Sequence, residues 1–145
     1  MQYLSELEST INDMVVKGRG ILAADESTGT IAKRFKSIGV ELTEENQRSW
    51  RSLLVTTEGL GEYISAIILF EATLKQKTDH GQAIQQAAWS QKIVPGVKVD
   101  KGTTALALSP GDLITQGLDG LAERLQGYKS EGARFAKWRE VYAVD

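Results

Sequence analysis

The chain has 145 residues, of which 25% are charged and 41% hydrophobic, and its formal net charge is −2. This composition predicts one soluble globular domain and excludes a disordered, collagen-like or coiled-coil chain. The near-neutral charge gives no electrostatic basis for nucleic-acid binding. The chain has no cysteine, which excludes disulfides, zinc sites with cysteine ligands and thiol catalysis. His80 is the only histidine, so a metal site with several histidines is also excluded.

Membrane and export signals are missing from the sequence. No stretch approaches the roughly 18 apolar residues of a membrane span, so no membrane partner is expected. The segment Met1–Glu6 lacks the cationic start and the apolar run of a signal peptide. We therefore expect a cytoplasmic protein. The alternative is a mature plastid form whose transit peptide is absent from this chain.

The first part of the chain alternates between helical and strand patterns. Apolar residues at helical spacing predict a helix over 4–14, and the short apolar run 21–24 predicts a buried strand that ends at Asp25. A second helix is predicted over 31–38. Thr43 is a suitable N-cap for a third helix, with Trp50, Leu53 and Leu54 as its apolar stripe. The remaining predicted elements are a strand at 64–70, short helices near 71–77 and 83–91, a strand at 97–100, a helix from 118 to about 132 and a strand from 134 to about 141.

Strands separated by helices predict right-handed βαβ units and an α/β fold with a parallel sheet. The predicted strands begin roughly 30–45 residues apart, which is typical of such units. Four strands can form a small open sheet or half of an eight-stranded barrel. The chain ends at Asp145, only a few residues after the last predicted strand, which favours a truncated chain. A complete small protein that ends on an edge strand is the alternative.

Charged residues gather where the predicted strands end, which is where enzymes with parallel sheets carry their sites. Asp25 ends the first strand, Lys98 and Asp100 share one face of the third, and Lys137 and Arg139 share one face of the fourth. Buried cations are costly without a counter-charge, so these positions predict an anionic ligand such as a phosphorylated sugar. A lysine here can polarise a carbonyl, and Asp25 can accept a hydroxyl proton.

Each of these residues also has a structural interpretation. Asp25 can cap the helix that follows it, Lys98 and Asp100 can pair with each other, and Lys137 and Arg139 can lie on a solvated edge. Trp138 is interpreted as a packing residue and His80 as part of a surface loop. The glycine-lysine-serine/threonine ending of a P-loop is absent from the sequence, although a helix starting near Asp25 can bind phosphate through its backbone amides.

The segment Gly18–Gly29 (GRGILAADESTG) resembles the N-terminal signature of class I fructose-1,6-bisphosphate aldolases. The similarity covers nearly the whole chain from about Leu4. Further matching segments follow in the family's order and spacing: Ala32–Arg34, Thr43–Asn46, Ile68–Phe70, Gly96–Gly102, Gln116–Leu121 and Phe135–Arg139.

The resemblance implies a TIM-type (β/α)8 barrel, of which residues 1–145 correspond to the N-terminal half with about four βα units. It also implies a lyase of glycolysis and gluconeogenesis. The family reversibly cleaves fructose 1,6-bisphosphate to dihydroxyacetone phosphate and glyceraldehyde 3-phosphate through a lysine Schiff base. No metal and no other cofactor is implied. Full-length members of the family form homotetramers.

The resemblance also assigns roles to individual residues. Asp25 is implied to orient and handle protons beside the Schiff base, and Lys137 to stabilise charge that develops as the C–C bond breaks. The implied substrate and phosphate contacts are Lys98, Arg139, Ser27, Thr30 and Arg34, the last three in the loop and helix after the first strand.

Other parts of the family pattern are missing or altered in this chain. The family's Schiff-base lysine and its glutamate acid–base residues lie on later strands, past Asp145, so we expect the chain alone to be inactive. Gln47 stands where the family often has arginine, and Glu71-Ala72 replaces a pair with an acid at its second position. The alternative functions are a non-catalytic half-barrel interaction domain, whose exposed strand edges recruit a partner, and a small phosphate-binding domain.

Overall fold

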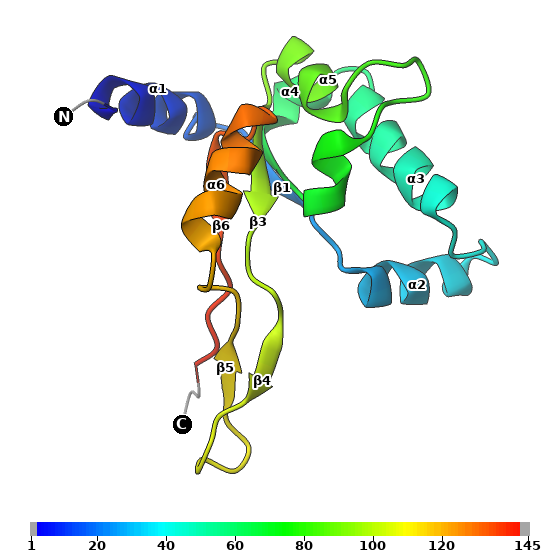
Figure 1. Cartoon of the computed structure of the whole chain (residues 1–145). Helices are drawn as coiled ribbons and strands as arrows, with labels where there is room; N and C mark the ends of the chain where they lie inside the picture. Colours follow the sequence, from blue (N-terminus) through cyan, green and yellow to red (C-terminus); the bar gives the residue numbers. More distant parts are fainter. Residues whose placement is uncertain (1–2, 143–145) are drawn as a thin grey trace.

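The computed structural model of the chain describes residues 3–142, and its helices and strands alternate as the sequence pattern predicts (Figure 1). The elements are, in order, α1 (Leu4–Met14), β1 (Gly20–Ala24), α2 (Thr28–Ser37), α3 (Glu44–Thr56), α4 (Leu60–Tyr63), β2 (Ile64–Leu69), the 3-10 helix η1 (Glu71–Lys75), α5 (Ile84–Ser90), β3 (Val94–Lys98), β4 (Thr103–Ala105), β5 (Leu113–Thr115), α6 (Leu121–Ser130) and β6 (Phe135–Lys137). Among these residues, no helix is both long enough and apolar enough to cross a membrane.

Four strands form one parallel sheet in the order β1-β2-β3-β6. The register aligns the carboxyl ends of the strands, because Ala24 is opposite Leu69, Leu69 is opposite Val97, and Lys98 is opposite Lys137. Each link is a crossover of the βαβ type, which places the residues after each strand at one edge of the sheet. The predicted α/β fold with a parallel sheet is therefore confirmed.

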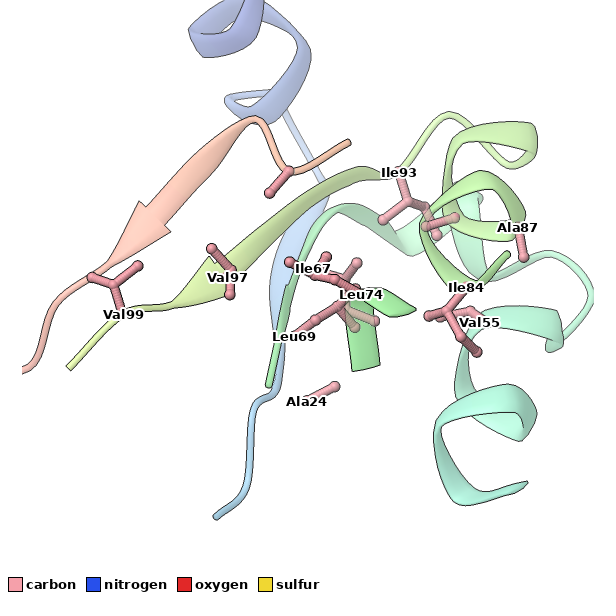
Figure 2. Close-up of a cluster of buried hydrophobic side chains, with 12 residues drawn as sticks. Ala24, Val55, Ile67, Leu69, Leu74, Ile84, Ala87, Ile93, Val97 and Val99 are labelled. Carbon is pink, nitrogen blue, oxygen red and sulfur yellow. The ribbon is translucent and has the colours of Figure 1, made fainter. Parts of the chain in front are cut away.

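The core lies where β2 and β3 meet the helices α3 and α5. Ile67 and Leu69 of β2 pack with Val97 of β3, Val55 of α3 and Ile84 of α5, and all five side chains are buried (Figure 2). A strand that is buried on both faces has an almost continuous apolar sequence, which is why 64–69 gives so clear a strand pattern. Trp138 is half-buried and packs against this cluster, as its interpretation as a packing residue predicts.

Two apolar patterns form the predicted elements but not the predicted core. β1 was predicted to be a buried strand, yet Ile21 is 49% exposed because β1 is the edge strand of the sheet and pairs only with β2 in the part that the structure describes. In α3 the N-cap is confirmed, since the Thr43 side chain accepts the N–H of Asn46 at 3.0 Å. However, Leu53 of the predicted stripe is exposed. Edge position and helix orientation are tertiary properties that local spacing does not determine.

Four predicted boundaries are wrong. β3 begins at Val94 and includes Pro95. Proline has no backbone N–H to donate, but the Pro95 carbonyl still accepts the N–H of Arg134 at 2.8 Å. β3 ends at Lys98 and β6 ends at Lys137, so Asp100 and Arg139 lie just past their strands. The last helix begins at Leu121, not at 118, because Gly120 precedes it with a φ of 63°, outside the right-handed helical region.

The antiparallel hairpin of β4 and β5 was not predicted from the sequence. It extends away from the parallel sheet (Figure 1), and Leu106 N–H donates to the Asp112 carbonyl at 2.9 Å across its end. Its strands have only three residues each, too few to show a period of two. The Thr115 hydroxyl donates to the Arg139 carbonyl at 2.8 Å, which connects the hairpin to the segment after β6.

Gly61 lies in α4 where the helix touches the loop after α5. A Cβ at this position would lie 2.0 Å from the backbone carbonyl oxygen of Gln91, which cannot move aside as a side chain can. We expect Gly61→Ala to lower the free energy of unfolding by about 3 kcal/mol in urea denaturation. Gly127→Ala in α6 is the matched control, since its Cβ meets nothing within 4 Å and alanine favours helices by about 1 kcal/mol. Equal effects of the two changes would contradict this packing.

Candidate functional site

A pocket of about 490 Å³ lies at the carboxyl ends of the strands. It collects six of the seven residues that the sequence nominated: Asp25, Ser27, Thr30, Lys98, Lys137 and Arg139. A second pocket, of about 360 Å³, lies between α1, α6 and the strands β3 and β6, and it contains none of the seven. The polar pocket is therefore the candidate site.

Asp25 and Lys137 meet inside this pocket. Asp25 follows β1, Lys137 ends β6, and the Lys137 Nζ donates to Asp25 Oδ2 at 2.7 Å. The Asp25 side chain is only 9% exposed, and that of Lys137 is 36% exposed. The two residues belong to opposite edges of the sheet, which in a flat four-stranded sheet are about 14 Å apart. Both side chains therefore project from the same face, toward which the sheet curves.

Asp100 organises the two other cations that the sequence nominated. Its fully buried Oδ1 lies 2.8 Å from Lys98 Nζ and 3.5 Å from an Arg139 guanidinium nitrogen, and it accepts the Gly102 N–H at 3.1 Å. Oδ2 is buried as well and has no partner in the part of the chain that the structure describes. Lys98 and Asp100 therefore do pair with each other, while their position beside Arg139 also places them in the pocket.

The contacts of Asp100 set its ionisation. Burial raises the pKa of the carboxyl, but the hydrogen bonds from Lys98 and Gly102 and the charges of Lys98 and Arg139 outweigh burial, so the pKa lies below its ordinary value. A lowered pKa in the folded state gives stability that is present above the unfolded-state pKa, near 4, and is lost as pH falls through the folded value.

We expect Asp100→Asn to reduce the acid dependence of stability. The wild-type free energy of unfolding should fall as the pH is lowered from about 5 to below 4, because protonation of Asp100 then favours the unfolded chain. The variant should be less stable than the wild type at pH 7 and should lose less stability on acidification. Urea denaturation between pH 7 and pH 3 measures both slopes. If the free energy of unfolding of the variant falls with pH as steeply as that of the wild type, Asp100 contributes nothing to the loss of stability in acid.

Ser27 and Thr30 lie at the start of α2, and their hydroxyl oxygens are 3.2 Å apart. Ser27, not Asp25, is the N-cap residue of this helix, so the alternative that Asp25 caps it is wrong. Arg34, the seventh nominated residue, does not line the pocket. Its guanidinium pairs with Glu26 at 2.5 Å, and its side chain is 58% exposed.

Glu71 and Lys101 also line the pocket, and the sequence reasoning did not nominate them. Lys101 Nζ lies 2.7 and 2.8 Å from the two carboxylate oxygens of Glu71, and the Tyr128 hydroxyl donates to the same carboxylate at 2.5 Å. Burial and the Glu71 carboxylate raise the pKa of Tyr128 to about 12. Their positions in the sequence could have indicated both residues. Glu71 comes two residues after β2 and Lys101 directly follows Asp100, so both lie at the carboxyl ends of strands.

The lining suits an anion with several hydroxyl groups. Lysine and arginine side chains bind phosphate, and the serine and threonine hydroxyls donate and accept hydrogen bonds. Among residues 3–142, no group of three or more histidine, aspartate or glutamate side chains is arranged to hold a metal ion. His80 is exposed in the loop before α5, as predicted, and lies outside the pocket.

Comparison with known proteins places this geometry in a family. Residues 6–145 match the family model of class I fructose-bisphosphate aldolase. The chain is 53% identical over 141 residues to a probable fructose-bisphosphate aldolase class 1 from Xanthomonas campestris, covering 97% of this chain and 42% of that protein. It is also 53% identical over 142 residues to the chloroplastic fructose-bisphosphate aldolase 2 of Pisum sativum, covering 98% of this chain and 41% of that protein.

A solved structure agrees with the sequence relatives. It is a fructose-bisphosphate aldolase from Plasmodium falciparum, in complex with TRAP and a small-molecule inhibitor. The TM-score is 0.93 at 51% sequence identity, and the match covers 97% of this chain and 41% of that one. The chain thus spans about two fifths of the length of these relatives, whose names describe lyases. With the family model matching residues 6–145, the chain belongs to the class I fructose-bisphosphate aldolase family.

Proposed function

We propose that residues 1–145 form the first half of a class I aldolase (β/α)8 barrel and supply the phosphate-binding and proton-handling side of its active site. The reaction is the reversible cleavage of fructose 1,6-bisphosphate to dihydroxyacetone phosphate and glyceraldehyde 3-phosphate, a step of glycolysis and gluconeogenesis. The observation that carries the proposal is the 2.7 Å contact between Asp25 and Lys137, made across a curved four-stranded sheet inside a polar pocket. A curved parallel sheet with both edges unpaired in the described residues is the shape that a half-barrel requires.

In this proposal the charged residues of the pocket have different roles. Lys98 and Arg139, held side by side by Asp100, bind a phosphate group of the substrate. As the C–C bond breaks, the proton of the adjoining hydroxyl passes to a base and the bonding electrons flow to a protonated imine. Asp25 orients that hydroxyl and handles its proton, and the Lys137 ammonium stabilises the developing charge. The imine lysine comes from outside these 145 residues, so the chain alone does not turn over substrate.

Binding of fructose 1,6-bisphosphate to the isolated chain tests this assignment without requiring catalysis. We expect saturable binding by isothermal titration calorimetry, with unphosphorylated fructose binding at least tenfold more weakly. Arg139→Met and Lys98→Met should each weaken bisphosphate binding about tenfold.

Lys129→Met is the matched control for these variants, because Lys129 also forms an ion pair, with Glu6 at 2.9 Å, but lines the other pocket. Its affinity for fructose 1,6-bisphosphate should equal that of the wild type. Equal binding of fructose and its bisphosphate, or an equal loss in the control, would overturn the proposed function.

A further inference from the structure

The charges that line the pocket cancel. Its basic side chains are Lys98, Lys101, Lys137 and Arg139, and its acidic side chains are Asp25, Glu26, Glu71 and Asp100. Each of the four cations already has a carboxylate partner within 3.5 Å. An anionic ligand therefore has to compete with the protein's own carboxylates for the cations that it contacts. One of these ion pairs therefore has to open when the ligand binds.

Lys101 and Glu71 form the pair that is easiest to open. Their side chains are 41% and 35% exposed, whereas those of Lys98 and Asp100 are 14% and 0% exposed. Water screens an exposed pair and solvates its members when they separate, so little is lost when one partner is replaced. A buried carboxylate such as Asp100 has no such compensation, so Lys98 and Arg139 stay paired with it even when they also contact a ligand.

Tyr128 holds Glu71 in place when Lys101 leaves. Its hydroxyl donates to the Glu71 carboxylate at 2.5 Å from α6, a separate element from the loop that carries Lys101. The carboxylate therefore keeps a hydrogen-bond donor after the ammonium has moved to a ligand. Lys101 has a long, flexible stem, and its charge can turn from Glu71 toward the pocket that both residues line.

We propose that Glu71 competes with the ligand's phosphate for the Lys101 ammonium and thereby determines how much negative charge a ligand must carry to be bound. This rests on the proposed function, because it takes the pocket to be a phosphate site. A phosphate monoester with two negative charges attracts Lys101 more strongly than the single charge of Glu71 does, whereas a singly charged phosphodiester does not. Glu71 is thus a specificity-determining residue that favours terminal phosphate groups.

The test compares Glu71→Gln with Glu6→Gln. Each change removes one negative charge, and each wild-type carboxylate pairs with a lysine and is about one-third exposed, but Glu6 lines the other pocket. The probes are inorganic phosphate at pH 8, mainly a dianion, and dimethyl phosphate, a monoanion, titrated into the chain by calorimetry. We expect Glu71→Gln to bind phosphate about three- to tenfold more tightly than the wild type and to gain measurable binding of dimethyl phosphate. Glu6→Gln should remain within about twofold of the wild type.

Two further variants connect the gain to Lys101. Adding Lys101→Met to Glu71→Gln should abolish the gain. Tyr128→Phe should lower phosphate affinity about twofold, because Glu71 then keeps no hydrogen-bond donor from Tyr128 when Lys101 leaves it. The competition is overturned if the wild type binds phosphate and Glu71→Gln binds it no more tightly, or if the double variant keeps the gain. If neither the wild type nor Glu71→Gln binds phosphate, both the proposed function and the competition between Glu71 and phosphate are overturned. If Glu71→Gln does not fold, unchanged phosphate affinity in Tyr128→Phe would overturn the competition instead.

Discussion

Replacing Arg51 with methionine should lower the free energy of unfolding by about 3 kcal/mol or more, a large fraction of the stability of a small domain. The Arg51 side chain is 4% exposed and forms an ion pair with Glu26, whose side chain is 8% exposed. Arg51 also donates to the Glu26 backbone carbonyl at 3.1 Å. Removing the guanidinium leaves the Glu26 carboxylate in a nearly water-free position with only the exposed Arg34 as a counter-charge, and this desolvation is the physical source of the large effect.

Arg34→Met is the matched control for Arg51→Met. Arg34 pairs with the same Glu26 carboxylate at 2.5 Å, but its side chain is 58% exposed. The control should therefore cost less than about 1 kcal/mol. Adding Glu26→Gln to Arg51→Met should restore part of the lost stability, because the buried charge, which has lost its buried partner, is gone. Urea denaturation at pH 7 measures all four proteins, and equal losses in the two arginine variants would contradict the role given to burial.

The second large effect is an asymmetry between Lys137→Met and Asp25→Asn. Lys137→Met leaves the Asp25 carboxylate, 9% exposed, without a partner among the described residues, and should cost about 2–3 kcal/mol. Asp25→Asn leaves an ammonium whose side chain is 36% exposed and can reach water, so it should cost about 1 kcal/mol. Urea denaturation of the chain without ligand measures both losses in the free energy of unfolding.

The double variant measures the coupling between Asp25 and Lys137. If the two side chains interact as the 2.7 Å contact indicates, the double variant should lose less stability than the sum of the single losses, by about 1 kcal/mol or more. Additive losses would mean that Asp25 and Lys137 do not touch in solution. In that case the curvature of the sheet, which the contact requires, would also be in doubt.

The sequence predicted those parts of the fold that depend on local composition. The run Ile64–Leu69 is apolar because β2 is buried among its neighbours, and the Thr43 cap depends on residues only three apart. The sequence overestimates the burial of β1 because the place of β1 at the edge of the sheet depends on which strands pair. The residues 21–24 do not determine that pairing. The hairpin was missed because its strands are shorter than the period that reveals a strand.

The site shows the same division between local and distant contacts. The pairing of Lys98 with Asp100, two residues apart, was among the alternatives that the sequence offered. The contact between Asp25 and Lys137 joins residues 112 positions apart, and only the strand order and the curvature of the sheet bring them together. The sequence nominated both residues by their place at strand ends. It could not nominate Tyr128, which reaches the Glu71 carboxylate from the middle of a helix.

We propose that this chain binds and polarises a sugar bisphosphate but lacks the lysine that forms the imine. The most direct test is to incubate the intact chain with fructose 1,6-bisphosphate and sodium borohydride, which reduces an imine to a stable amine, and then to weigh the protein. We expect an unchanged mass under conditions in which calorimetry shows the bisphosphate bound. A single stoichiometric adduct, mapped by peptide mass to one lysine such as Lys137, would contradict the claim and make that lysine the nucleophile.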